Sequence, residues 1–176
     1  MMTLDELQRA DINLTIAREA YDQADKRLAD TLDTKKAFEQ KAFTLFGGYL
    51  TISLALFGAG GAAAGTPSLK YLMTPFWGTG AVLVIGTIFF LLALTDRHYG
   101  ALASHPDMWL NKGIVDGPDS VLPAMLSYIT FYMGERIDVS VAMNRKKADW
   151  IRWGIYAGIA SPLAFALFFL TFRHVP

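Results

Sequence analysis

The sequence predicts an all-α integral membrane protein, with three transmembrane helices and a cytosolic stalk of two long parallel helices. Two observations lead to this prediction. Three stretches of 20 residues or more carry no charged side chain, and two of them follow directly on polar segments with a helical heptad pattern. The 176 residues are 53% hydrophobic with a mean hydropathy of +0.30, which favours one small membrane domain over an ordinary soluble domain.

The first segment, residues 1–41, is expected to be a cytosolic amphipathic helix. Thr3 and Glu6 have the spacing of a capping box, which marks a helix N-terminus. A heptad seam follows, and its large side chains include Leu7, Leu14, Tyr21 and Leu28. Since no proline or glycine interrupts this pattern before Gly47, one unbroken helix should run into the membrane. The partner of the seam is either another helix of the same chain or a second copy in a coiled coil.

The first span is expected at residues 42–65, which contain no charge over 24 residues. At 1.5 Å per residue this stretch covers about 36 Å, enough to cross the roughly 30 Å hydrocarbon core of a bilayer. From Gly58 to Gly65 every residue is Gly or Ala, so another backbone can approach closely. We therefore expect a helix-packing or oligomer face formed by Gly58, Gly61 and Gly65.

The connection at residues 66–70 is short and is expected to be an external turn between antiparallel helices. The second span follows at residues 71–95, with Trp77 near its start as an interfacial anchor. Residues 96–120 are interpreted as a cytosolic loop with several Gly, Pro, Asp and Asn residues. The isolated apolar residues Met108 and Trp109 make this loop a candidate binding site for a cytosolic partner.

A second long cytosolic helix is predicted at residues 121–152, and it continues into the third span at residues 153–172. Its heptad seam includes Leu122, Ile129, Tyr132 and Met143. Extra apolar residues indicate that this helix buries more than one face. Because both long helices run toward the membrane, we expect them to lie side by side and parallel, so that the two seams cover each other.

The third span contains two features that affect helix packing. Gly154 and Gly158 have the small-x-x-x-small spacing that also occurs at the end of the first span. These glycines are interpreted as packing helices together, either inside one bundle or between copies. Pro162 lacks the amide that would bond the carbonyl of Gly158, so we expect a kink unless the hydroxyl of Ser161 or a water compensates.

The distribution of positive charge predicts the orientation in the membrane. Seven Lys and Arg residues precede the first span, one lies at residues 66–70, seven lie between the second and third spans, and one follows the third. The positive-inside rule therefore places the N-terminus and residues 96–152 in the cytosol, and the C-terminus outside. All 16 acidic residues then also lie in the cytosol.

Several classes of function are disfavoured by the composition. The 16 basic and 16 acidic residues leave no net charge, so nucleic-acid binding is not expected. No span contains an ionisable side chain, which argues against a pump or a coupled transporter. Cysteine is absent and the three histidines show no diagnostic ligand spacing, so we expect no enzyme activity, no metal and no cofactor. A passive pore lined by hydroxyls or by glycine backbone is compatible with the sequence.

Two stretches resemble a known type of membrane effector. One is Asp33-Thr34-Lys35-Lys36-Ala37, just before the hairpin of spans, and the other is residues 128–150 before the last span, with Ile137, Asn144 and Lys147. In this order they resemble the Pycsar transmembrane effectors and the related SLATT-type domains of bacterial nucleotide-signalling antiphage systems. The resemblance implies a protein that assembles and impairs the inner membrane when a nucleotide signal arrives. No cyclic-nucleotide-binding domain follows the spans in these 176 residues, so the resemblance does not identify the trigger.

The leading functional interpretation is a self-associating protein of the bacterial inner membrane that perturbs permeability on a cytosolic signal, in antiphage defence. Its partners are then the lipid bilayer, further copies of the chain, and a cytosolic protein or nucleotide signal. Two alternatives stay open. One is a membrane scaffold or anchor subunit for a cytosolic partner, and the other is a phage-encoded, holin-like membrane protein.

Overall fold

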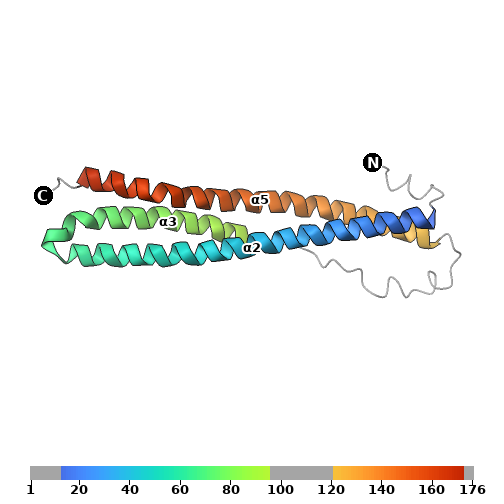
Figure 1. Cartoon of the computed structure of the whole chain (residues 1–176), viewed down its shortest axis with the longest axis horizontal. Coiled ribbons are helices and arrows are strands. Elements are labelled where there is room, and N and C mark those ends of the chain that lie inside the picture. Colours follow the sequence, from blue (N-terminus) through green and yellow to red (C-terminus); the bar gives the residue numbers. More distant parts are fainter. Residues whose placement is uncertain (1–12, 96–120, 173–176) are drawn as a thin grey trace. The chain divides into compact units, whose positions relative to one another are not determined.

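The computed structural model describes residues 13–95 and 121–172, and every element in these ranges is a helix (Figure 1). Along the chain they are α2 (Leu14–Ala64), η1 (Pro67–Leu72), α3 (Met73–Leu94) and α5 (Val121–Phe172). Three of the described helical stretches are long and apolar enough to cross a membrane. The prediction of an all-α protein with three candidate transmembrane helices is therefore confirmed.

Helix α2 begins at Leu14 because Asn13 caps it. The side-chain Oδ1 of Asn13 accepts a hydrogen bond from the backbone N–H of Thr15 at 2.8 Å, and its carbonyl accepts one from Ala17 at 3.0 Å. Asparagine is among the best residues for this role. Of the helix expected at residues 1–41, the structure describes the part from Leu14 onward, and that part is helical throughout. The capping box at Thr3 and the seam residue Leu7 lie outside the described residues, as do Met108 and Trp109 in the predicted partner loop.

The connection between α2 and α3 is helical rather than a simple turn. Thr66 is extended, with φ −117° and ψ 109°, as expected for a residue that precedes proline. Pro67 then starts the 3₁₀ helix η1, in which the Leu69 N–H bonds the Thr66 carbonyl at 2.9 Å. The sequence predicted a turn at residues 66–70, but the preset φ of Pro67 suits the first turn of a helix, so η1 leads directly into α3.

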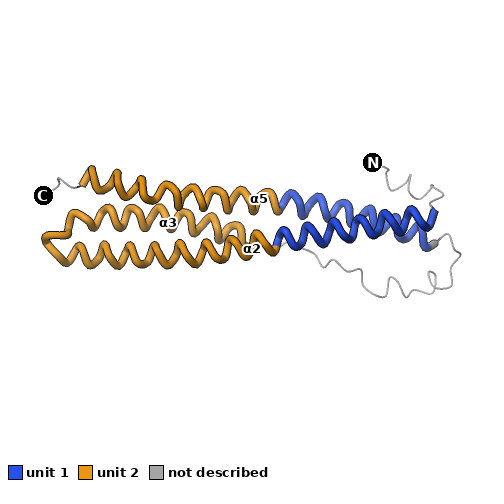
Figure 2. Tube along the Cα trace, viewed as in Figure 1, with its two compact units in different colours: residues 1–35, 97–143 blue, residues 36–96, 144–176 orange. Residues whose placement is uncertain are grey.

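The chain divides into two compact units, and both α2 and α5 contribute residues to each unit (Figure 2). Unit 1 comprises residues 1–35 and 97–143, and unit 2 comprises residues 36–96 and 144–176. The described part of unit 1 consists of the first part of α2 and the first part of α5. Its buried apolar side chains come from both helices: Ala17, Leu28, Leu126, Ile129 and Ile137.

The seam predicted for α2 is the face that this helix buries in unit 1. Leu28 is buried, and Leu14 and Tyr21 are half-buried, whereas most of the residues between them are exposed. Small side chains also lie on this face, where Ala17 is buried and Ala24 is half-buried. Leu14, Tyr21 and Leu28 thus lie on the less exposed face of α2.

The seam predicted for α5 is only partly correct. Ile129 is buried and Leu122 and Met143 are half-buried, but Tyr132 is 41% exposed, so its placement in the seam is wrong. The hydroxyl groups of Tyr132 and Tyr128 are instead hydrogen-bonded to each other at 3.2 Å on the outside of the helix, and this bond raises the pKa of Tyr132. The true seam passes through the polar Ser140, which an apolar pattern does not reveal.

In unit 2, α3 runs antiparallel to α2. The ring of Tyr49 meets the ring of Phe90 edge-on, with centroids 5.0 Å apart. Phe57, two turns further along α2, lies against Gly80, which comes earlier in α3. The indole N–H of Trp77, earlier still in α3, donates to the Phe57 carbonyl at 3.2 Å. The two helices therefore form a hairpin closed by η1.

Helix α3 also packs antiparallel against α5. The ring of Phe89 stacks on Trp150 with centroids 5.8 Å apart, and Phe76 lies 5.6 Å from Phe165 at the other end of the contact. About 39% of the most apolar stretch of α3 is buried, against 11% for α2 and 6% for α5. Within unit 2, α3 is thus the most enclosed of the three helices.

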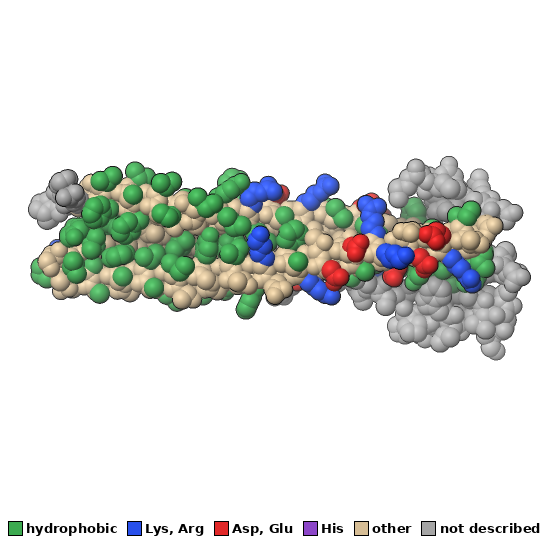
Figure 3. Space-filling model, in the orientation of Figure 1, with side chains coloured by type: hydrophobic (Ala, Val, Ile, Leu, Met, Phe, Trp, Pro, Cys, Tyr) green, Lys and Arg blue, Asp and Glu red, His purple; other side chains and the backbone are tan. Residues whose placement is uncertain are grey.

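Side chains of different kinds cover the two units. Figure 3 shows hydrophobic side chains gathered over unit 2 and acidic side chains over unit 1. The exposed large hydrophobic residues of unit 2 include Leu54, Ile88, Ile159, Leu163 and Leu167. So much exposed apolar surface on long helices suits a lipid environment, and together with the three long apolar helices it suggests a membrane protein.

Candidate functional site

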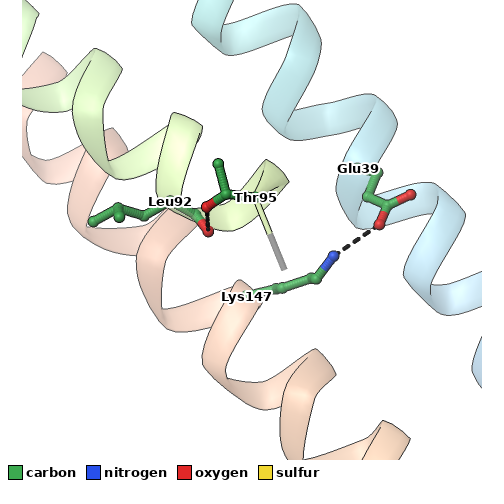
Figure 4. A network of polar contacts seen from close by, with 4 residues as sticks. All are labelled: Glu39, Leu92, Thr95 and Lys147. Atoms are coloured by element: carbon green, nitrogen blue, oxygen red, sulfur yellow. Dashed lines mark hydrogen bonds and ion pairs between the residues drawn. The ribbon is translucent and has the colours of Figure 1, made fainter. Parts of the chain in front are cut away.

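A buried ion pair joins α2 and α5 in unit 2. The Nζ atom of Lys147 on α5 lies 2.7 Å from Oε1 of Glu39 on α2. The Lys147 side chain is 1% exposed, whereas that of Glu39 is 35% exposed. Figure 4 shows the lysine reaching from α5 across to the carboxylate on α2. The ammonium group is therefore shielded from water. The carboxylate to which it is bonded is still partly exposed to water.

The ion pair lies at the end of the hydrophobic core of unit 2. That core contains Ala42 from α2, Phe90 and Ala93 from α3, and Ile151 from α5. Glu39 comes three residues before Ala42 and Lys147 four residues before Ile151, so each is about one helical turn from the core. The polar contact between α2 and α5 thus directly adjoins the apolar one.

The end of α3 lies beside this ion pair. Thr95 is the C-cap of α3, where its N–H bonds the Leu91 carbonyl at 3.0 Å. Its hydroxyl bonds the Leu92 carbonyl at 3.2 Å, as Figure 4 shows. The ion pair therefore connects α2 and α5 at the level where α3 ends.

Burying an unpaired charge is unfavourable in free energy. This penalty makes the contact specific for one alignment of α2 with α5. Removing an ammonium group from water costs several kcal/mol, and a carboxylate at hydrogen-bond distance offsets much of this. Apolar heptad contacts tolerate a slide of one helix along another better than a short ion pair does. The Lys147–Glu39 contact therefore favours one register between α2 and α5.

Glycines give the helices of unit 2 their close packing. A Cβ atom added at Gly154 would lie 2.5 Å from the ring of Phe90, and one at Gly158 would overlap the hydroxyl of Tyr49. Both glycines predicted in the third span thus pack inside the chain. Gly60 similarly faces the indole ring of Trp77. This last contact was not predicted, because the glycine spacing of the first span pointed to other positions.

The glycines predicted to form a packing face in the first span lie differently. Nothing lies within 4 Å of a Cβ atom added at Gly58 or Gly61, and at Gly65 the nearest atom is a carbonyl of its own helix. For Gly58 and Gly61, packing inside one bundle is therefore wrong. Contact of these glycines with another copy stays a prediction.

Pro162 is accommodated within α5 by the preceding residue. The helix continues through it to Phe172, and Pro162 is the proline inside this helix. The hydroxyl of Ser161 donates to the carbonyl of Gly158 at 2.8 Å, which is the carbonyl that loses its amide partner to the proline. The compensation by Ser161 considered in the sequence analysis is present.

Sequence analysis gave no role to either member of the ion pair. Lys147 lies in a stretch that carries the family resemblance, but the resemblance implies no function for it, and it does not include Glu39. A signal does exist, because seven positions spaced by four and three along α5 are polar or glycine except for Ile151: Ser140, Asn144, Lys147, Ile151, Gly154, Gly158 and Ser161. All seven are buried or half-buried.

The chemistry that the described side chains offer is electrostatic. Within residues 13–95 and 121–172, no three His, Cys, Asp or Glu side chains come together in a way that could hold a metal ion. The Lys147–Glu39 pair is a contact between two helices, and its formation or loss changes how α2 and α5 are held together. This property makes it the candidate functional site of the chain.

Comparison with known proteins provides no further guide to function. The chain has no significant match among protein-family models, among curated protein sequences or among solved structures.

Proposed function

We propose that this chain is a self-associating membrane effector that changes membrane permeability when the part outside the bilayer receives a signal. The membrane is the inner membrane of a bacterium, and the signal is one that arises during phage infection. The observation that carries the proposal is the continuity of the two long helices. Helix α2 is 51 residues long and α5 is 52 residues long, and each includes both a charged segment and an apolar segment able to cross a membrane.

In this proposal the charged segments of α2 and α5 form a cytosolic stalk of two parallel helices. The positive-inside rule supports the orientation, since 14 of the 16 Lys and Arg residues lie before the first span or between the second and third. A helix transmits a shift or rotation along its axis because its backbone hydrogen bonds resist local distortion. A change in the stalk is thereby passed to the spans without an intervening hinge.

The Lys147–Glu39 pair supports such transmission. It ties α2 to α5 one turn from the apolar core, at the level where α3 ends. With this contact in place, α2 and α5 move together rather than sliding past each other. The proposal therefore assigns the pair to coupling between the stalk and the spans.

Self-association is supported by the open faces of the spans. Gly58 and Gly61 have no neighbour within 4 Å of an added Cβ, and most of the apolar stretches of α2 and α5 are exposed. Small residues contribute little contact with lipid but allow a second helix to approach closely. Copies of the chain are thus expected to meet along the Gly58–Gly65 segment of α2.

The proposal predicts loss of membrane potential in living cells. Bacteria expressing the chain are loaded with a potential-sensitive dye and challenged with phage, with cells carrying an empty vector as the control. We expect rapid depolarisation only in challenged cells that contain the protein in their membrane fraction. If cells with membrane-inserted protein keep their potential during phage challenge and during overexpression, the proposal is wrong.

A further inference from the structure

Unit 2 carries a pronounced excess of positive charge. Its described residues include seven Lys and Arg but only two acidic residues, Glu39 and Asp149. Both carboxylates are already used, because Glu39 pairs with Lys147 at 2.7 Å and Asp149 pairs with Arg152 at 3.2 Å. In the described residues of unit 1, by contrast, seven acidic residues exceed five basic ones. The surplus of cations is therefore specific to unit 2.

Most of this surplus lies at one end of the spans. We define the basic collar as Lys36 and Lys41 on α2 with Arg145 and Lys146 on α5, all of which are exposed. Lys36 and Lys41 are separated by about 8 Å along the axis of α2, and Arg145 and Lys146 are adjacent in α5. Because the Lys147–Glu39 contact fixes the relative level of the two helices, the two groups of cations overlap in height.

Three cations of the basic collar are not neutralised by the rest of the described chain. Among residues 13–95 and 121–172, Lys41, Arg145 and Lys146 form no ion pair with an acidic side chain. Exposed cations of this kind attract anions, and several acting together attract them more strongly. The collar therefore has the charge of a surface that binds an anionic partner.

Aromatic residues beside the basic collar indicate the level in the bilayer at which an anionic partner would bind. Directly beyond the collar, Trp153 and Tyr156 project outward, 57% and 51% exposed, with their rings 5.8 Å apart. Exposed Trp and Tyr side chains are typical of the headgroup level of a bilayer. After these rings, α5 has no charged residue up to Phe172. The collar thus lies at the boundary between the apolar spans and the charged segments.

We propose that the basic collar binds the headgroups of anionic phospholipids and selects these lipids as immediate neighbours of the protein. A lipid is favoured over a soluble polyanion because the cations adjoin an aromatic and apolar surface that suits the acyl chains. Clusters of four or more Lys and Arg beside a membrane span commonly recognise anionic lipids in this way. The inference requires insertion in a membrane but does not depend on the change in permeability.

The test uses the full chain in nanodiscs that contain equal amounts of phosphatidylglycerol and phosphatidylcholine. After mild release from the nanodisc, native mass spectrometry identifies the lipids that remain bound to the protein. We expect phosphatidylglycerol to exceed phosphatidylcholine by about threefold or more among the retained lipids. The excess should fall as salt is added, because exposed charges are screened.

Two charge-matched variants show where the lipid binds. The collar variant carries Lys41→Gln, Arg145→Gln and Lys146→Gln, and the control variant carries Arg18→Gln, Lys26→Gln and Arg27→Gln in unit 1. All six positions are exposed, so both variants should keep the helix content and the thermal stability of the parent protein. We expect the collar variant alone to retain the two lipids in their bulk ratio. Equal retention of both lipids by the parent, or an equal loss of preference in both variants, would overturn the inference.

Discussion

Replacing Glu39 with leucine should lower the free energy of unfolding by about 3–5 kcal/mol, because it removes the carboxylate that lies 2.7 Å from the buried ammonium of Lys147. The reverse change, Lys147→Met, should cost only about 1–2 kcal/mol. The difference follows from the exposure of the two side chains. Glu39 is 35% exposed and can be hydrated after its partner is lost, whereas Lys147 is 1% exposed and cannot. Chemical unfolding of the purified protein in detergent, followed by circular dichroism, measures both values.

The double variant Glu39→Leu, Lys147→Met is the control for this prediction. With both charges removed, the contact becomes apolar, and its stability should return close to that of the parent protein. Arg152→Met, which breaks the exposed pair with Asp149, should change stability by less than about 1 kcal/mol. Equal effects of Glu39→Leu and Arg152→Met would show that the Lys147–Glu39 contact does not hold α2 to α5.

Two glycine substitutions should have opposite consequences for folding and for assembly. Gly154→Leu introduces a Cβ 2.5 Å from the ring of Phe90, which is 0% exposed and has no space to move. Overpacking of this kind costs about 1–3 kcal/mol or more, so we expect a lower unfolding temperature. Gly61→Leu meets nothing within 4 Å inside the chain and should leave the unfolding temperature unchanged or slightly raised.

Assembly should respond in the other direction. If Gly58 and Gly61 form the contact between copies, Gly61→Leu blocks the close approach of a second helix and shifts the protein toward the monomer. The mass of the protein in nanodiscs, measured for the parent and for Gly61→Leu, reports this shift. An oligomer of unchanged mass and stability in the Gly61→Leu variant would mean that this face contacts lipid only.

The sequence predicts the elements of this fold better than it predicts their contacts. The three candidate spans follow directly from the long uncharged stretches of the sequence. The less exposed face of α2 contains the regularly spaced residues Leu14, Tyr21 and Leu28. Asn13 caps the start of α2 through its side chain, and heptad periodicity does not reveal such a cap. The connection at residues 66–70 was predicted from its length alone, which does not distinguish a turn from η1.

The site was harder to predict because its residues are polar. A search for buried positions by hydrophobicity selects Tyr132 on α5 and passes over Ser140 and Lys147, although the last two are buried. Burial of a lysine side chain depends on a partner that compensates its charge. Here the partner is Glu39, which lies 108 positions away from Lys147 in the sequence. The glycines illustrate the same limit, since spacing alone does not separate Gly154, which packs against Phe90, from Gly61, which is open.

In the proposed function, α2 and α5 transmit a signal from the stalk to the spans because each is one continuous helix. The most direct test of this claim is the membrane potential of phage-challenged cells that express the Ala142→Pro variant, with Ala142→Ser as the matched control. Ala142 is exposed on α5, and proline there removes one backbone hydrogen bond and bends the helix at a cost of about 3 kcal/mol. We predict that both variants reach the membrane in equal amounts and that only Ala142→Ser depolarises the cells. Depolarisation by Ala142→Pro as strong as that by the parent protein would contradict the claim.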